Sequence, residues 1–288
     1  MADAAAKTET LETPSGKRSG DENFPVGSWL LPARLRPHIA AYYAIARTTD
    51  DIADNPDLSP EEKLRRLDAF ESAVKGETAG EPIPVTARRM RESLAATGLG
   101  PRHVIDILAA FKQDATKLRY DDWDDLMGYC MLSASPVGRY VLDLHGEDRS
   151  TWKASDPLCN ALQVLNHLQD CQDDYRALDR VYLPEPWLGE AGTSVEALDA
   201  DRASAALRSV IDRLLDGVDD LMVQARELPG AVRNRRLAME TAIIVRLADR
   251  LRVLLRAGDP LAGRVALSRW DFARAGIGGI FGGLLFGR

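Results

Sequence analysis

The sequence predicts an all-α protein. Amphipathic patterns with a period near 3.6 residues recur along most of the chain, alternating runs of β-branched residues are few, and hairpin turn signals are absent. A strong helix start occurs at Ser59-Pro60-Glu61-Glu62, with Ser59 as N-cap, Pro60 in the first turn and Glu62 completing a capping box. These observations favour one helical domain that covers residues 23–275.

The expected helices lie between breaks made by glycine, proline and polar residues. Residues 1–22 are polar and predict a disordered tail, so ordered structure is expected from Asn23. Pro37 is tolerated in the first turn of the first helix, and Pro229-Gly230 separates the last two long patterns. The expected helices cover residues 33–49, 60–74, 85–97, 101–117, 122–132, 136–144, 156–178, 194–228 and 231–256.

The last residues, 276–288, are apolar and rich in glycine. Two interpretations are open for this tail. It forms either a disordered end or a loose apolar flap that contacts a membrane or covers an apolar channel. The segment is too short to span a bilayer.

Composition excludes several classes of function. The 288 residues are 45% hydrophobic and carry a net charge of −7 without a visible basic stripe, which argues against a nucleic-acid partner. Residues 1–22 lack an apolar run, so no signal peptide is expected, and no stretch of 18 apolar residues predicts a membrane span. Three cysteines without metal-ligand spacing are typical of a reducing compartment. We expect a cytoplasmic protein that can also contact the inner membrane peripherally.

The most informative stretch lies in the expected helix 156–178. Asn166, Asp170 and Asp174 are spaced four apart and therefore share one stripe of that helix, with Gln163 and Asp173 at its edges. Like charges at this spacing repel each other, whereas carboxylate and amide oxygens are ligands that Mg²⁺ accepts. For this stretch alone, an acidic helix face without a ligand is the alternative.

A second stretch repeats the pattern near the end of the expected helix 33–49. Asp50 and Asp54 are again four apart, and Arg47 lies one turn back on the same face. Two such stripes facing each other across a cavity would hold Mg²⁺ ions that bridge to a diphosphate, which Arg47 would also contact. The ions would act as Lewis acids on the leaving diphosphate. The pair of stretches therefore predicts the ionisation of a diphosphate.

Taken as a set, these and other motifs show a resemblance that runs from about residue 23 to about residue 269. The chain resembles the squalene/phytoene synthase family in Arg47-x-x-Asp50-Asp51-x-x-Asp54, Tyr129-Cys130, Val137-Gly138, Gln163-x-x-Asn166-x-x-x-Asp170-x-x-x-Asp174 and Arg180-Val181-Tyr182-Leu183-Pro184. The resemblance implies an all-α isoprenoid synthase-like helical bundle with a central cavity. It also implies Mg²⁺-dependent ionisation of a prenyl diphosphate.

The resemblance implies roles for individual residues. The implied Mg²⁺ ligands are Asp50, Asp54, Asn166, Asp170 and Asp174, of which the four aspartates are also the implied catalytic residues. The implied substrate-binding residues are Tyr43, Arg47 and Gln163 near the diphosphate, with Asp114 and Tyr129 lining the cavity.

Three further runs resemble the family members of bacterial hopanoid biosynthesis that convert presqualene diphosphate to an alcohol. They are Asn23-Phe24-Pro25-Val26, Leu31-Pro32-x-x-Leu35-Arg36 and Gly258-Asp259-Pro260-Leu261-Ala262-Gly263-Arg264. Gln169 stands where many relatives have arginine, Pro260 where some have tyrosine, and Asp21-Glu22-Asn23 where phytoene-type members have serines. Each departure changes a diphosphate contact and is compatible with one presqualene diphosphate as the substrate.

The resemblance leaves alternatives open. An enzyme of the same fold could instead join two farnesyl diphosphates into presqualene diphosphate, or make phytoene from geranylgeranyl diphosphate. A non-catalytic assembly protein that retains the fold is a third reading, although such proteins usually lose carboxylates that are whole in this chain. Contacts with other enzymes of the squalene pathway are also open.

Overall fold

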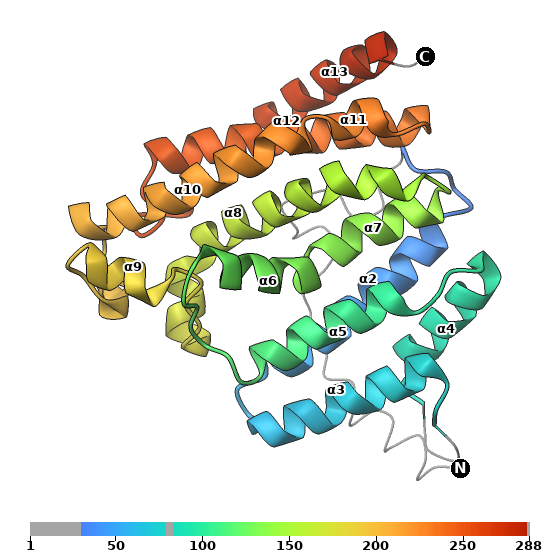
Figure 1. Cartoon of the computed structure of the whole chain (residues 1–288), viewed down its shortest axis with the longest axis horizontal. Coiled ribbons are helices and arrows are strands. Elements are labelled where there is room, and N and C mark those ends of the chain that lie inside the picture. The colour runs from blue at the N-terminus through green and yellow to red at the C-terminus, as the bar shows by residue number, and fades with distance from the viewer. Residues whose placement is uncertain (1–29, 79–82, 287–288) are drawn as a thin grey trace. The chain divides into compact units, whose positions relative to one another are not determined.

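The computed structural model describes residues 30–78 and 83–286, with side chains up to residue 278. Every regular element in these residues is a helix and none is a strand, which confirms the predicted all-α class (Figure 1). The chain divides into two compact units, Met1–Thr116 with Asp143–Gly146 and Lys117–Leu142 with Glu147–Arg288. The single domain expected over residues 23–275 stays a prediction. The predicted tail at residues 1–22 lies outside the described residues, as does the expected start of order at Asn23.

The first unit is built from four helices that follow one another along the chain. They are α2 (Arg36–Ala53), α3 (Pro60–Lys75), α4 (Val85–Thr97) and α5 (Arg102–Asp114). Helix α2 packs against the other three. Its Ile45 and Ile52 are fully buried together with Phe70 of α3, so the core of this unit fixes the rotation of α2. The predicted N-cap is confirmed, because Ser59 Oγ accepts a hydrogen bond from the Glu62 amide at 3.3 Å.

The second unit is organised around one long helix, α8. Its helices are α6 (Trp123–Ser133), α7 (Ser135–Leu144), α8 (Trp152–Leu178), α9 (Glu185–Glu190), α10 (Ala205–Ala225), α11 (Leu228–Ala231), α12 (Arg235–Ala257) and α13 (Arg269–Phe286). The end of α7 is grouped with the first unit. Helix α8 packs against α6, α10 and α12, and α13 packs on α12. The core on which α8 rests includes Leu165 and Leu168 of α8 and Leu215 of α10.

The prediction of one continuous helix over residues 194–228 is wrong in one respect. The chain forms a short 3₁₀ turn at Val195–Asp199 and starts α10 only at Ala205. Two local interactions explain the break. The Gln172 amide of α8 donates to the Leu198 and Ala200 carbonyls at 2.7 and 2.9 Å, and Ser204 caps the new helix by accepting from the Leu207 amide. These carbonyls would otherwise bond within a continuous helix.

The glycine-rich segment 276–288 is helical up to Phe286, as the last part of α13. This helix differs from the disordered end considered from the sequence, whereas the interpretation that the segment contacts a membrane or covers an apolar channel stays a prediction. A Cβ atom added at Gly278 would lie only 2.9 Å from the Arg246 guanidinium of α12, so glycine permits the close approach of the two helices. Among the described residues, no helix combines the length and apolar character needed to cross a bilayer.

Helix α7 lies so close to α8 that Gly138 has no room for a side chain. A Cβ atom there would lie 2.5 Å from Ser155 Oγ and 2.6 Å from Cys159 Sγ. We expect Gly138→Ala to lower the free energy of unfolding by about 1–3 kcal/mol, because short side chains on a packed helix cannot move aside freely. The control is Gly128→Ala in α6, which meets nothing within 4 Å and should stabilise the protein by about 0.5–1 kcal/mol. Denaturant unfolding of both variants measures the difference, and equal effects would contradict this packing argument.

Candidate active site

The first aspartate stretch lies at the C-terminal end of α2. Arg47 places its two terminal nitrogens on two carboxylates, with Nη1 2.7 Å from Asp50 Oδ2 and Nη2 2.7 Å from Asp51 Oδ1. Asp54 is the C-cap residue, and its amide bonds to the Asp50 carbonyl. Tyr43 lies one turn before Arg47 and is half-buried. The predicted spacing therefore places arginine and aspartate side chains together on one end of α2.

Negative charge accumulates around Asp50. Burial raises the pKa of Asp50 well above its usual range, and the carboxylates of Asp54, Asp114 and Asp51 raise it further, against the opposing effect of Arg47. Asp114 reaches this group from the end of α5 and is only 4% exposed. The structure thus brings together four residues that the sequence predicted for the site from the first unit, namely Arg47, Asp50, Asp54 and Asp114. The group has more carboxylates than cations, so a bound cation would be stabilised there.

The second aspartate stretch lies on α8 and forms the predicted stripe. Asn166, Asp170 and Asp174 are half-buried, as is Gln163, while Asp173 between the last two aspartates is exposed. Helix α8 ends soon after the stripe, because Asp179 adopts a left-handed conformation with φ of 51°. The stripe therefore occupies the last turns of α8 and leaves oxygen atoms accessible.

One residue of this site was quoted in a family-like run but assigned no role from the sequence. Arg264 Nη2 lies 3.5 Å from Asp170 Oδ1, and Arg264 belongs to the connection between α12 and α13. The buried Gln169 of α8 holds this connection, because its Nε2 donates to the Val265 carbonyl at 2.6 Å. Gln169 therefore has a structural use in this chain: it fixes the segment that brings an arginine to the aspartate stripe. Spacing patterns could not reveal the contact, which joins residues 96 positions apart.

We expect Gln169→Leu to loosen this connection. The Val265 carbonyl would lose its buried partner, at a cost of about 1–3 kcal/mol, and Arg264 would no longer be held beside Asp170. Turnover should fall by about 10–100-fold through misplacement, and trypsin should cut faster after Arg264. The control is Gln172→Leu, which frees a different loop from the same helix and should leave turnover near the wild-type value. Equal losses in the two variants would show that the Val265 contact has no special role.

A cluster of aromatic rings lies on the other side of α8 from its exposed residues. Tyr129, predicted from the resemblance, packs at 5.6 Å from the ring centroids of both Tyr120 and Tyr182. His167 of α8 stacks on Tyr182 with 3.4 Å between the ring centroids. Burial lowers the pKa of His167 to about 3, with a smaller contribution from Arg180, so the imidazole is neutral at physiological pH. His167 and Arg180 were not predicted as site residues.

The donor atoms in both stretches are those that Mg²⁺ prefers, namely carboxylate and amide oxygens. Among the described residues, no group of three or more histidine, cysteine or carboxylate side chains is placed so that it could hold a metal ion. Mg²⁺ commonly completes its shell with waters and substrate phosphate oxygens, so a few carboxylates suffice at each stretch. The residues present therefore fit Mg²⁺ that arrives with a diphosphate.

Helical architecture and aspartate-bearing helices together define an all-α enzyme with the isoprenoid synthase fold, acting on prenyl diphosphates. The family model of squalene/phytoene synthase matches residues 17–271, and the chain belongs to this family. Family members typically use a divalent metal. The resemblance inferred from the motifs is thereby confirmed.

Several relatives are similar over nearly the whole chain. A hydroxysqualene synthase from Rhodopseudomonas palustris is 45% identical over 271 residues, covering 94% of this chain and 92% of its own. One from Sinorhizobium fredii is 42% identical over 274 residues. Among solved structures, the squalene synthase HpnC from Alicyclobacillus acidocaldarius has a TM-score of 0.72 at 32% identity, covering 88% of this chain and 94% of its own. A dehydrosqualene synthase with a TM-score of 0.74 at 19% identity supports the fold alone.

Proposed function

We propose that this protein is a hydroxysqualene synthase, which converts presqualene diphosphate and water to hydroxysqualene and diphosphate in hopanoid biosynthesis. The observation that carries the proposal is that both aspartate stretches keep all their aspartates in a chain that is 45% identical to a hydroxysqualene synthase. A retained fold without catalysis would not require both stretches, since carboxylates in one stripe repel each other when no cation is bound.

Mg²⁺ is the proposed cofactor. Its proposed ligands are Asp50 and Asp54 of the first stretch and Asn166, Asp170 and Asp174 of the second. When bound, the metal would supply positive charge to the diphosphate and make it a better leaving group. Burial raises the pKa of Asp50 and the neighbouring carboxylates raise it further, and this excess of carboxylates supports a cation site at the first stretch.

The diphosphate would be bound by side chains with hydrogen-bond donors. Arg47 offers a guanidinium that its present carboxylate partners orient at the end of α2, and Tyr43 and Gln163 are half-buried polar side chains proposed for the same task. Arg264 beside Asp170 adds a second guanidinium, and this one is exposed. These residues would hold the diphosphate as its negative charge increases during bond breaking.

The reaction balances without a redox partner. The carbon–oxygen bond to diphosphate breaks, with the electron pair leaving on diphosphate, and a cyclopropylcarbinyl cation remains. The cyclopropane ring opens as the cation rearranges, water forms the new carbon–oxygen bond, and that water loses one proton. Aromatic faces such as that of Tyr129 would stabilise the cation, and apolar walls would delay water until the rearrangement is complete.

The test is product analysis of the purified protein with Mg²⁺. Presqualene diphosphate should yield an alcohol at the same rate with and without NADPH, and farnesyl diphosphate alone should yield nothing. Accumulation of presqualene diphosphate from farnesyl diphosphate would instead place the protein at the coupling step, and squalene formed only with NADPH would indicate hydride capture. No product from either substrate would favour the non-catalytic reading.

The product is an apolar hydrocarbon with one hydroxyl group, so it would partition into a bilayer. We therefore also propose that the protein works at the inner membrane surface as a peripheral protein. Contacts with the enzymes that make its substrate or use its product would be favoured there, because all three would share the same surface.

A further inference from the structure

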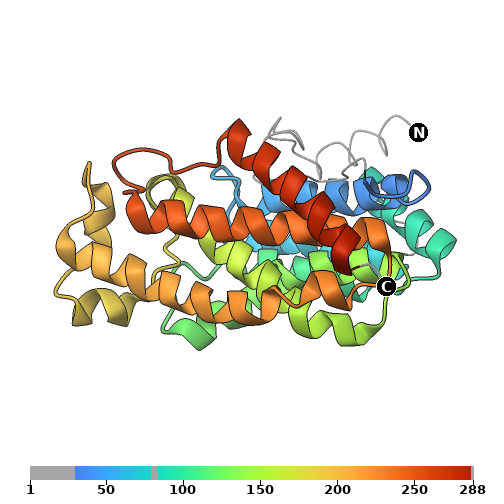
Figure 2. The same ribbon diagram turned by 90° about the horizontal axis from the view of Figure 1, so that it is seen from above.

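Helix α13 has large apolar side chains on its outer side. Trp270 is 80% exposed and Ile277 is 61% exposed, two of the most exposed large hydrophobic residues among those described. They are seven positions apart and therefore lie on one face of the helix. The helix packs along α12 (Figure 2). Asp271 and Ala275 are buried, and Gly278 lies against Arg246 of α12. This arrangement places bulky apolar groups outside and small residues inside.

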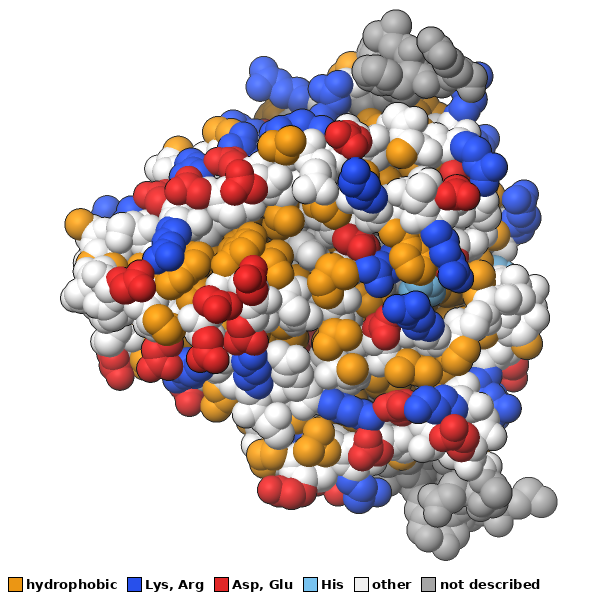
Figure 3. All heavy atoms as spheres, viewed as in Figure 1, with side chains coloured by type: hydrophobic (Ala, Val, Ile, Leu, Met, Phe, Trp, Pro, Cys, Tyr) orange, Lys and Arg blue, Asp and Glu red, His pale blue; other side chains and the backbone are white. Residues whose placement is uncertain are grey.

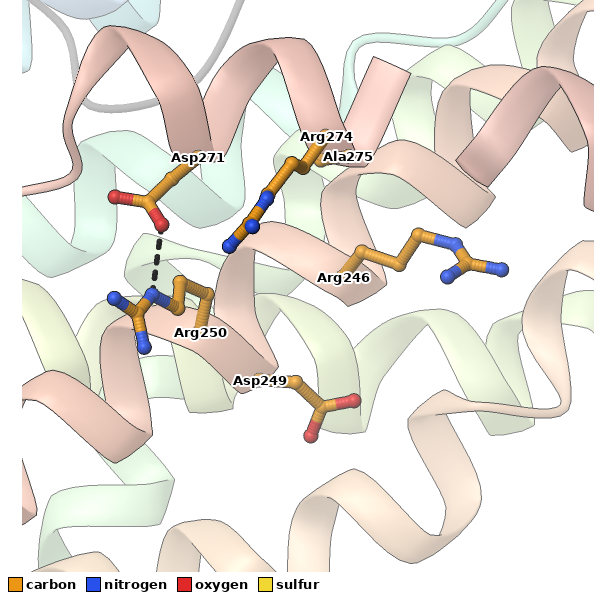
Figure 4. Close-up of a pocket in the computed structure, with 6 residues that line it drawn as sticks. All are labelled: Arg246, Asp249, Arg250, Asp271, Arg274 and Ala275. Carbon is orange, nitrogen blue, oxygen red and sulfur yellow. Dashed lines mark hydrogen bonds and ion pairs between the residues drawn. The ribbon is translucent and has the colours of Figure 1, made fainter. Parts of the chain in front are cut away.

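A basic pocket lies beside this apolar face, between α12 and α13. Its volume is about 370 Å³, and it is lined by Arg246, Asp249, Arg250, Asp271, Arg274 and Ala275 (Figure 4). In the close-up, Arg274 points from α13 toward α12, where Arg250 meets the Asp271 carboxylate. Figure 3 shows basic side chains gathered along the upper edge of the molecule, where α12 and α13 run.

The two acidic residues of the pocket already form ion pairs with arginines. Asp271 accepts from Arg250 Nε at 2.7 Å, and its bonds to Ser268, together with Arg250, lower the pKa of Asp271 to about 2. Asp249 accepts from Arg226 at 2.6 Å on its far side. Arg246 and Arg274 make no ion pair with any other described residue, and both are exposed. The pocket therefore retains uncompensated positive charge in a protein whose net charge is −7.

We propose that α13 and the Arg246–Arg274 pocket form a docking surface for a bilayer that contains anionic phospholipid. Trp270 and Ile277 enter the interface between head groups and acyl chains, and Arg246, Arg250 and Arg274 bind lipid phosphate. Charge favours lipid over a second copy of this chain, because two copies joined through this face would bring their arginines together. The purpose of the contact rests on the proposed function, since a bilayer would accept the apolar product, but the binding itself does not require catalysis.

The test uses the full chain without substrate and measures sedimentation with vesicles. Vesicles of phosphatidylcholine with added phosphatidylglycerol should bind the protein, vesicles of phosphatidylcholine alone should bind it more weakly, and added salt should reduce the difference. The pair Arg246→Gln and Arg274→Gln should weaken binding to anionic vesicles by about fivefold for each arginine. Trp270→Ala with Ile277→Asp should weaken binding to both kinds of vesicle by at least about tenfold.

The matched control is Val223→Asp, which adds the same charge at a 63% exposed valine on α10 and should bind as the wild type does. The proposal would be overturned if the wild-type protein did not bind anionic vesicles. It would also be overturned if the variant with Trp270→Ala and Ile277→Asp bound them as the wild type does. A wild-type dimer in solution that the α13 variant abolishes would assign the face to a second copy instead. Turnover of presqualene diphosphate in detergent should be equal in all these proteins. A failure of vesicle binding with that turnover intact would therefore leave the proposed reaction standing and overturn only the membrane contact.

Discussion

Replacing Asp170 with asparagine is expected to reduce turnover of presqualene diphosphate on the order of 1,000-fold while leaving the protein folded. The substitution keeps the size of the side chain but removes the negative charge from the centre of the α8 stripe. A neutral amide there would bind a divalent cation less well and would leave the leaving diphosphate without compensation for its charge. Asp50→Asn should have an effect of the same order from α2. Circular dichroism and a steady-state assay over a range of Mg²⁺ concentrations would measure both.

Asp173→Asn provides the control for these substitutions. Asp173 lies on the same helix and within the same run of acidic residues, but it is exposed and lies at the edge of the stripe, outside the proposed ligand set. Its loss removes one negative charge from the same region without removing a proposed ligand, so turnover should stay within about twofold of wild type. A wild-type rate for Asp170→Asn at limiting Mg²⁺ would contradict the assignment of Asp170 as a Mg²⁺ ligand.

Removing the carboxylate of Glu147 is expected to give the largest loss of stability, about 3–5 kcal/mol for Glu147→Ala. This side chain is 3% exposed, and its two oxygens accept hydrogen bonds from the Arg233 and Asn234 amides at 2.9 and 2.8 Å. Both amides lie at the start of α12, where backbone donors have no helical partners and a negative charge is favoured by the helix dipole. Without Glu147, both of these partly buried donors would lose their acceptor.

Glu190→Ala is the matched comparison for Glu147→Ala. Glu190 also bonds to an arginine, Arg213, at 2.8 Å, but both side chains are more than half exposed. Exposed ion pairs contribute about 0–1 kcal/mol, so this variant should unfold close to wild type. Urea unfolding of the two variants would separate the buried backbone acceptor from the surface pair, and similar midpoints would contradict the role given to Glu147.

Local signals predicted the fold well where they are self-contained. The start of α3 at Ser59-Pro60 and the helix over Val85–Thr97 were found because caps, proline positions and apolar spacing all lie within a few residues of each other. The failures occur where distant residues decide. The break before Ala205 depends on Gln172 of another helix, and α13 forms through a glycine-rich segment because its backbone packs closely on α12. Low helix propensity is overcome there by tertiary contact.

In the candidate site, too, residues related by local spacing could be predicted, and contacts between distant residues could not. The aspartates of both stretches could be predicted because a spacing of four residues has a direct meaning on a helix. The position of Asp114 beside Asp50 was anticipated only through the family resemblance, since no local pattern links α5 to α2. The contact of Arg264 with Asp170 depends on how the connection before α13 folds back on α8, and single-sequence reasoning has no access to such a return.

Helix α8 carries three kinds of residue within four positions: His167 toward the tyrosines, Gln169 toward Val265, and Asp170 in the oxygen-bearing stripe. Each residue of a helix is rotated by about 100° from the last. One inserted or deleted residue between His167 and Asp170 would therefore rotate these side chains relative to one another, so that they could not all keep their present contacts. Substitutions in this segment can be compensated one at a time, but a change in its length cannot. We therefore expect homologous chains to vary freely in the loops around α8 while keeping the length of this segment constant.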